Sequence, residues 1–237
     1  MTDPAPPAHL SAFQLARQLG DRLPTADSVP DAAFELVERV RELVEAVVMT
    51  DVEPADLELA AEQVEAVISR LHGRRREVPL YLVRHPDGRI ESLMQAGSGR
   101  LNPQAPPIRW SVRPTEPAAD SPPNPVECVA HCTFTAAHSG SPSRVHGGVI
   151  AAALDECLGV AATAAGASGM TVALQVNLRG GTPFGRPVQI RTRVTRIDGR
   201  KTHVAGEVVA DGEVTADATA LCIQAREPEP EEQETGA

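Results

Sequence analysis

The stretch Arg144 to Gly159 reads RVHGGVIAAALDECLG, and it predicts an apolar, alanine-rich helix with two acids in its middle. From Val145 to Leu178 no side chain other than Asp155 and Glu156 carries a formal charge. An ionised carboxylate in apolar surroundings is costly unless it is paired or exposed. These two acids are therefore the first residues for which a function should be sought.

Small residues share a helix face with Asp155. On a helix, positions three, four and seven residues apart lie on one face. Around this acid, these positions include Gly148, Ala151, Ala152, Gly159 and Ala162. Small side chains permit the close approach of a strand or of another subunit, so we expect Asp155 at a crowded seam. The alternative is that Asp155 and Glu156 both lie on an exposed side of the helix.

The composition indicates a soluble protein with an aliphatic core. The 237 residues are 42% hydrophobic but only 3% aromatic, and the formal net charge is −10. A chain of this length can hold one large domain, or one small domain with an appendage. The negative charge argues against nucleic-acid binding, which needs a basic face. No secretory signal or membrane-spanning run is visible, and the four cysteines are scattered, so we expect a cytoplasmic protein.

Residues 1–95 are expected to form a helical hairpin followed by a short β-hairpin. Apolar residues recur at helical spacing from about Asp31 to Met49 and again after Pro54, which suits the first turn of a second helix. Pro86-Asp87-Gly88 marks a turn between two strand-like runs. The apolar stripes of the two helices must be covered by the rest of this chain or by another subunit. We therefore interpret the hairpin as a packing or oligomerisation element, whose further role the sequence does not indicate.

The rest of the chain is divided by composition. Residues 96–125 are rich in Gly, Pro and Ser and are expected to be a linker or an irregular wrap, and residues 226–237 predict a disordered acidic tail. Residues 126–225 have the pattern of one helix and several strands separated by glycine-containing turns. The strand-like segments are VECVAHCTFT, MTVALQVNL, PVQIRTRVTRI, THVAGEVVA and VTADATALCI. One helix with an antiparallel run of strands predicts an α+β domain in which the helix packs on a sheet.

The HGG sequence places two glycines at the predicted start of the helix. Gly147 and Gly148 let another backbone or a ligand come close. The first N–H groups of a helix lack intrahelical acceptors and carry the positive end of the helix dipole. An oxyanion or a polarised carbonyl can bind at such a place. The sequence therefore predicts a carbonyl or oxyanion site two turns before the carboxylate of Asp155.

The VHGG motif is the first of several features that follow one another in order. Asp155 lies nine residues after His146, and Thr171 lies sixteen residues beyond Asp155. Further along the chain, TPFGRP is typical of a turn between strands, and IDGRK is typical of a hairpin. In this order the features resemble those of the PaaI-type acyl-CoA thioesterases, which have the hotdog fold. The resemblance covers roughly Asn102 to Gln224 and leaves the N-terminal part unexplained.

The resemblance implies a hotdog fold, an antiparallel sheet wrapped around the helix, that dimerises through continuous strands into a homodimer or a dimer of dimers. The active site would lie between subunits. Asp155 would be either the general base that activates water or the nucleophile that attacks the thioester carbonyl. The Gly147 N–H would polarise that carbonyl, and His146 would shape the turn. Thr171 of the neighbouring chain would hold the water or orient the acid.

The implied substrate is an acyl-CoA or acyl-carrier thioester, with coenzyme A as part of the substrate and no metal or redox cofactor. Coenzyme A is a polyanion, so an acidic protein needs a local positive patch to hold it. Arg200 and Lys201, at a hairpin end, are the expected phosphate contacts, and Gly148 is expected to line the substrate site. Arg191 and Arg193 are interpreted as a solvated strand face. Neither nucleic acid nor a membrane is expected among the partners.

Cysteine-based chemistry is disfavoured by the spacing of the residues. Cys128 and Cys132 share one face of a strand about 13 Å apart, which is too far for one tetrahedral zinc site. His131, between them, points the other way. Cys157 is a candidate nucleophile, but a buried cysteine on an alanine-rich helix is usually a packing residue.

Two alternatives to hydrolysis stay open. Some members of the family carry an Asn or Gln shortly before HGG and others an acid at the position of Ser139, whereas this chain reads HSGSPSR at residues 138–144. One alternative is therefore a non-catalytic module that binds acyl-CoA, with the helical hairpin as its interaction domain. The other is a different thioester reaction, such as dehydration. That chemistry usually needs a His–acid pair at the acyl chain, and His146 is better suited to a structural role.

Overall fold

The computed structural model describes residues 19–116 and 125–224, and the chain forms two compact units. Of the described residues, unit 1 comprises 19–107 and Thr135–Ala137, and unit 2 comprises 108–116, 125–134 and 138–224. The helical hairpin belongs to unit 1, and the helix of the HGG motif belongs to unit 2. The predicted acidic tail, residues 226–237, lies outside the described residues.

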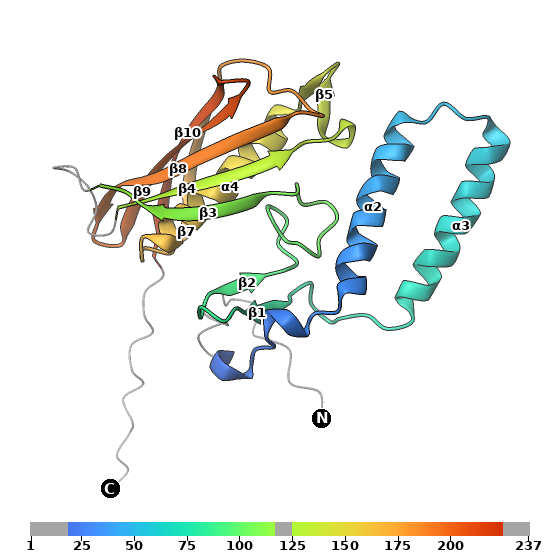
Figure 1. Ribbon diagram of the computed structural model, residues 1–237, viewed down its shortest axis with the longest axis horizontal. Helices are drawn as coiled ribbons and strands as arrows, with labels where there is room; N and C mark the ends of the chain where they lie inside the picture. The colour runs from blue at the N-terminus through green and yellow to red at the C-terminus, as the bar shows by residue number, and fades with distance from the viewer. Residues whose placement is uncertain (1–18, 117–124, 225–237) are drawn as a thin grey trace, which may run out of the picture. The chain divides into compact units, whose positions relative to one another are not determined.

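Unit 2 is a six-stranded antiparallel sheet with one long helix, α4 (Gly147–Ala164), packed on it (Figure 1). The strands are β3 (Arg109–Pro114), β4 (Val126–Thr133), β7 (Met170–Leu178), β8 (Pro187–Asp198), β9 (Lys201–Ala210) and β10 (Glu213–Ile223). Their order in the sheet is β3-β4-β8-β9-β10-β7, so β3 and β7 are the two edges. The single-turn helix η3 (Ala136–His138) and a small ribbon of β5 (Ser139–Ser141) and β6 (Arg144–Val145) precede α4.

Side chains alternate across the strands as predicted. On β8, Val188, Ile190 and Val194 are buried, whereas Arg191 and Arg193 are exposed. The five predicted strand segments agree with β4, β7, β8, β9 and β10 to within two residues at either end. The predicted α+β architecture, one helix packed on an antiparallel sheet, is therefore confirmed.

Small side chains let α4 lie close to the sheet. The buried residues of α4 are Ile150, Ala153, Leu154, Cys157, Leu158, Ala161 and Ala162. The buried side of β10 is lined by Ala216, Ala218 and Ala220. On β9, a Cβ at Gly206 would lie 3.3 Å from Leu158 Cδ2 of α4, and on the side of β8 it would lie 2.5 Å from Thr192 Cγ2 and 2.9 Å from the Arg191 carbonyl oxygen, so glycine is required there. Thr192 Oγ1 donates a hydrogen bond of 2.8 Å to the Cys157 carbonyl oxygen, which ties α4 to the sheet.

By length and hydropathy alone, α4 is the one helix in the described part of the chain that could span a membrane. Its apolar residues, however, pack against β4, β8, β9 and β10 at the centre of the core of unit 2. A helix that is apolar on most of its surface is expected in such a place. The packing therefore accounts for the composition of α4.

The beginning of the sheet differs from the prediction. The sequence predicts a linker or wrap over residues 96–125, but β3 lies within this stretch and pairs antiparallel with β4. An edge strand needs no strongly apolar face, and the prolines around β3 obscure its pattern. Unit 2 accordingly begins at Ile108 rather than at Val126.

Unit 1 is built on two helices and a small β-ribbon. Helices α2 (Asp31–Met49) and α3 (Pro54–His72) occupy the segments in which the sequence predicts helices, and β1 (Leu82–Arg84) pairs antiparallel with β2 (Ile90–Ser92). Two short 3-10 helices, η1 (Gly20–Arg22) and η2 (Ala26–Ser28), precede α2. The larger core cluster of this unit consists of Val29, Val37, Val83, Leu93 and Leu101. Helix α3 contributes no buried side chain.

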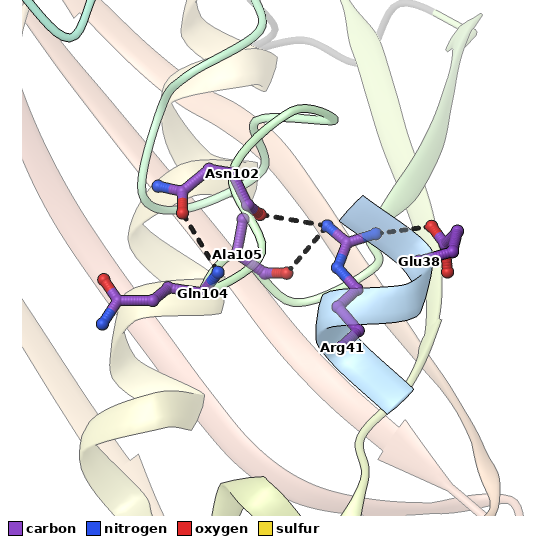
Figure 2. A network of polar contacts seen from close by, with 5 residues as sticks. All are labelled: Glu38, Arg41, Asn102, Gln104 and Ala105. Carbon is purple, nitrogen blue, oxygen red and sulfur yellow. Dashed lines mark hydrogen bonds and ion pairs between the residues drawn. The ribbon is translucent and has the colours of Figure 1, made fainter. Parts of the chain in front are cut away.

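An arginine of α2 fixes the loop that follows β2 (Figure 2). Arg41 Nη2 donates hydrogen bonds to the carbonyl oxygens of Asn102 at 3.2 Å and Ala105 at 3.1 Å. Arg41 Nη1 donates to Glu38 Oε1 at 2.7 Å, one turn earlier on the same helix. The Asn102 side chain accepts a hydrogen bond of 3.0 Å from the Gln104 N–H and closes the loop. Because a guanidinium presents its donors as a planar fork, one side chain holds both carbonyls.

The four cysteines are unpaired thiols buried in unit 2. Burial raises the pKa of Cys128 to about 11, the pKa of Cys132 to about 12, and the pKa of Cys157 well above its usual 9. The thiolate is the reactive form, so these thiols are poor nucleophiles, in agreement with a packing role for Cys157. His131 is exposed on the strand that buries Cys128 and Cys132. In the described residues, no group of three or more His, Cys, Asp or Glu could hold a metal ion.

Alkaline pH should destabilise the fold through these thiols. Because their pKa is higher in the folded than in the unfolded chain, their stabilising contribution is complete below about pH 9 and is lost as the pH rises toward the folded value. Cys132→Ala should therefore flatten the fall in the free energy of unfolding above about pH 9 by roughly 1 kcal/mol per pH unit. Urea titrations at several pH values measure this slope.

The exposed neighbour Thr133 provides the matched control, because Thr133→Ala removes no titrating group. This variant should keep the slope of the wild type. An unchanged slope in Cys132→Ala would contradict the assignment of the alkaline instability to the buried thiols.

Candidate active site

The backbone before α4 is held in a tight turn. The N–H of His146 donates to the His138 carbonyl oxygen at 2.9 Å, and the N–H of Val145 donates to the Thr182 carbonyl oxygen at 2.9 Å. At Gly140, a Cβ would lie 2.6 Å from the His146 Cα, so a larger residue does not fit. These contacts fix the direction in which α4 starts.

The first N–H groups of α4 are satisfied locally, with one exception. His146 is the N-cap, and its Nδ1 accepts a hydrogen bond of 3.0 Å from the Gly148 N–H. The N–H groups of Val149 and Ile150 donate to the His146 carbonyl oxygen at 2.9 and 3.2 Å. Among these first four N–H groups, that of Gly147 is the one without an acceptor in the described residues. The positive end of the helix dipole is therefore presented through this one group.

Gly147 also lies against the end of β7. A Cβ at this position would lie 2.7 Å from Leu178 Cδ1, the tip of a flexible side chain. Leu178 is 59% exposed, although Ala216, its partner on β10, is fully buried. Sequence analysis does not single out Leu178, because a contact between a helix start and a strand end depends on the register of the sheet. The free N–H of Gly147 thus has an apolar side chain beside it.

Asp155 lies midway along α4 with one oxygen unsatisfied. Its Oδ1 is buried and has no hydrogen-bond partner in the described residues, although the residue as a whole is partly exposed. A buried polar atom without a partner is rare and calls for an explanation. On the same helix face, Gly148 and Ala152 are exposed, and Gly159 has open space beside it. Within one subunit, the face next to Asp155 is therefore open rather than crowded.

Thr171 and Asp155 of one subunit both lie near Cys222. Thr171 is opposite Cys222 in the pairing of β7 with β10, with 3.9 Å between Thr171 Oγ1 and Cys222 Sγ. Burial raises the pKa of Cys222, the hydrogen bond with Thr171 lowers it, and the charge of Asp155 raises it further. Cys222 is not among the residues that sequence analysis proposes for the site. The alternation of Ala216, Ala218, Ala220 and Cys222 along β10 is the signal that could have placed it on the helix side.

The two edges of the sheet differ in their protection against further strand pairing. β3 contains two arginines and a proline, which discourage pairing at an edge. β7 contains no charged residue, and its helix-facing Leu174 and Leu178 are exposed. Its first residue, Met170, is 67% exposed. β7 is therefore the edge that is suited to pairing with another strand.

Most arginines of the basic region in β8 and its flanks are paired with acids. The ion pairs join Arg179 to Asp217, Arg186 to Asp211, Arg191 to Glu207 and Arg196 to Asp198. In the described part of the chain, Arg200 and Lys201 have no ion-pair partner, and Arg200 Nη1 donates to the Gln224 carbonyl oxygen at 2.9 Å. These two residues, the predicted phosphate contacts, therefore keep their charge available for an anion.

The two phosphate-contact candidates lie far from the helix start of their own subunit. Lys201 pairs with Ile223, and Ile223 pairs with Met170 at the start of β7. Gly147, by contrast, touches Leu178 at the end of β7. Nine residues of extended strand span roughly 26 Å. A single subunit thus keeps the helix start and the basic hairpin apart, at opposite ends of β7.

Comparison with known proteins identifies the fold of unit 2. Residues 143–216 match the family model of the thioesterase superfamily. A crystal structure of a thioesterase superfamily protein is 29% identical, with a TM-score of 0.67 and coverage of 84% of this chain and 97% of that one. A Ralstonia eutropha protein, described as a candidate thioesterase related to phenylacetic acid degradation, is 26% identical (TM-score 0.41; 48% of this chain, 83% of that one). A Streptococcus mutans protein crystallised with acetyl CoA is 15% identical (TM-score 0.41; 48% and 87%).

The predicted resemblance to the thioesterase superfamily is thereby confirmed, and so is the hotdog fold. The match to the first of these crystal structures spans 84% of this chain, which is more than unit 2 alone. The similarity to that protein therefore includes residues of unit 1.

Removing the cap at His146 should destabilise the protein, and another side chain that accepts a hydrogen bond should restore most of the lost stability. His146→Ala removes the Nδ1 acceptor of the Gly148 N–H and should lower the free energy of unfolding by about 1 kcal/mol. His146→Asn supplies an oxygen acceptor and should lose much less. Urea unfolding followed by circular dichroism measures both, with the exposed His131→Ala as the control. Equal losses in the Ala and Asn variants would argue against a capping role.

Proposed function

We propose that the protein hydrolyses the thioester of an acyl-CoA or acyl-carrier substrate, since residues 143–216 match the family model of the thioesterase superfamily. Asp155 is the general base or the nucleophile, and the Gly147 N–H polarises the thioester carbonyl. One observation carries the proposal: on α4, neither the buried Oδ1 of Asp155 nor the N–H of Gly147 has a hydrogen-bond partner in the described residues. An anionic acceptor and a donor at a helix N-terminus are the groups that attack on a carbonyl requires.

Two routes fit these groups. In the general-base route, Asp155 takes a proton from water while the water oxygen attacks the thioester carbon, and the Gly147 N–H stabilises the charge on the carbonyl oxygen. The C–S bond then breaks, and the thiolate takes up the proton. In the nucleophilic route, the carboxylate attacks, the thiolate leaves, and water hydrolyses the mixed anhydride. Both routes consume one water and release a carboxylic acid and a thiol.

The length of the helix argues that one subunit does not supply both groups to one carbonyl. Asp155 follows Gly147 by eight residues, which is about 12 Å along a helix. A donor and a base for the same carbonyl each lie about 3 Å from the reacting atoms. We therefore assign the Gly147 N–H and the Asp155 carboxylate of each site to two different copies of the chain.

The free edge of β7 is the place at which the second copy pairs in this proposal. Pairing about a two-fold axis across β7 is antiparallel, so the Met170 end of one copy lies beside the Leu178 end of the other. Asp155 is near the Met170 end, through Thr171 and Cys222, and Gly147 is at the Leu178 end. The pairing therefore brings the acid of one copy toward the helix start of the other and makes the protein a homodimer.

The other predicted site residues fit the same arrangement. The Thr171 hydroxyl, whose contact in the described residues is Cys222 Sγ, would hold the attacking water or orient Asp155 of its own copy, and not that of the neighbouring chain as the resemblance implies. Arg200 and Lys201 lie at the Met170 end, so antiparallel pairing moves their charge toward the helix start of the other copy, where they would bind phosphates of coenzyme A. Gly148 is exposed at that helix start and lets the substrate approach the backbone.

Asp155→Asn should lower kcat at least about a hundredfold in a thiol-release assay on short, medium, long and aryl acyl-CoAs. The amide can neither take a proton from water nor attack the carbonyl. Because Oδ1 has no partner in the described residues, the variant should resist urea as well as the wild type does. Glu156→Gln, at the neighbouring carboxylate, is the matched control and should retain activity.

Two results would contradict the assignment of Asp155. One is an equal loss of activity in both variants. The other is a wild type that binds acyl-CoA but releases no thiol, which would favour the non-catalytic binding module. The acyl-CoA on which the wild type acts fastest would name the substrate class.

Gly147→Pro should lower kcat by about a hundredfold or more, because it removes the N–H proposed to polarise the carbonyl. Proline is well tolerated at the first helical position, so α4 should still form. Gly147→Ala keeps the N–H and displaces the same Leu178 side chain, so it controls for the added bulk. Steady-state kinetics and circular dichroism measure rate and helix content. A Pro variant as active as the Ala variant would rule out a role for this N–H.

A further inference from the structure

Helix α3 of unit 1 carries an apolar stripe that no other residue in the described part of unit 1 buries. The stripe is formed by Leu57, Val64, Val67, Ile68 and Leu71, which recur at helical spacing. Four of these five residues are exposed by 39% to 49%, and none of the residues of α3 is buried. Most of the stability of a helix in a protein comes from packing of its apolar face. The stripe of α3 therefore lacks the partner that its composition requires.

We propose that the partner is α3 of a second copy of this chain, packed antiparallel about a two-fold axis near Val64. This inference concerns unit 1 and does not depend on the thioester chemistry. It adds a second self-interface to the one proposed at β7, and together the two would give a dimer of dimers.

The charges along the α3 segment select the second copy and the antiparallel direction. The first part of the segment is acidic and contains Glu53, Asp56, Glu58, Glu62 and Glu65. The last part is basic and contains Arg70, His72, Arg74, Arg75 and Arg76. Antiparallel packing places the acidic part of each copy against the basic part of the other, whereas parallel packing would juxtapose like charges.

The apolar residues agree with the same axis. Symmetry about Val64 places Leu57 of one copy opposite Leu71 of the other, and Glu58 opposite Arg70. It also places the small Ala60 and Ala61 opposite the bulkier Ile68 and Val67. Pairing large with small side chains allows two helices to approach closely. One register therefore satisfies both the shape and the charge of the helix.

The exposed apolar surface of this helix pair is of the size that marks an interaction site. The end of α2 adds further exposed apolar residues, which are Leu43, Val44, Val47, Val48 and Met49. With α3 these side chains leave several hundred Å² of apolar surface per copy, about the largest patch that a soluble monomer usually exposes. A standard interface buries roughly 800 Å² per partner.

A disulfide across the proposed axis tests the inference on the full chain. Val64→Cys places two thiols next to each other in the pair of helices, so mild oxidation should link most of the protein into covalent dimers. Glu62→Cys is the matched control: it lies on the opposite side of the helix, about 160° away, and should link at least tenfold more slowly. The four natural cysteines are buried and contribute little background. Non-reducing electrophoresis gives both rates.

Charge reversal provides an independent readout that a general loss of folding would not reproduce. Arg70→Glu in the Val64→Cys background should slow linking about tenfold, and adding Glu58→Arg should restore it. Equal linking of Val64→Cys and Glu62→Cys, or no rescue by the double reversal, would overturn the proposal. If Val64→Cys does not link and resists a thiol reagent, another segment of the same chain covers the stripe. If it does not link but reacts freely, the stripe is uncovered. A Val64→Cys variant that fails to link therefore overturns the proposal, whether or not it reacts with the reagent.

Discussion

The close approach of α4 to the sheet is the constraint on which the rest of unit 2 depends. It is favoured by Gly206 on β9, where a Cβ would lie only 3.3 Å from Leu158 Cδ2 of α4 and would also clash with Thr192 and Arg191 of the neighbouring strand β8. It also requires the alanines of β10 and the small residues of α4 that face them. Thr192 then bonds to a carbonyl oxygen in the middle of the helix. The depth and the direction of α4 are both set by these contacts.

A helix fixed in this way holds its functional groups at set distances. The turn that packs Gly140 on His146 determines where α4 begins, and within the described part of the chain the cap leaves the Gly147 N–H without an acceptor. Asp155 follows two turns later with a buried oxygen that no described residue pairs with. Since a straight helix cannot bring these two groups together, the proposed chemistry needs two copies. The uncharged edge of β7 offers the place for that pairing.

Much of this arrangement could be predicted from the sequence, because it rests on local patterns. Alternation along β8 and the apolar run of α4 indicate which faces are buried, and HGG indicates the helix start. The edge strand β3 could not be predicted, because it lies among prolines and needs no apolar face. Leu178 and Cys222 could not be assigned to the site either, since their places depend on the pairing of β7 with β10. The distance of Lys201 from Gly147 likewise follows from sheet register alone.

The central claim, that each site combines Gly147 of one copy with Asp155 of the other, is tested most directly by subunit mixing. Asp155→Asn and Gly147→Pro are each expected to be nearly inactive, but a mixed dimer would contain one site with both groups intact. Random assembly of equal amounts should therefore restore about a quarter of the wild-type thiol-release rate in a two-fold symmetric dimer. If the mixture releases no more thiol than the two variants do separately, both groups of a site come from the same copy, and the account of the shared site is wrong.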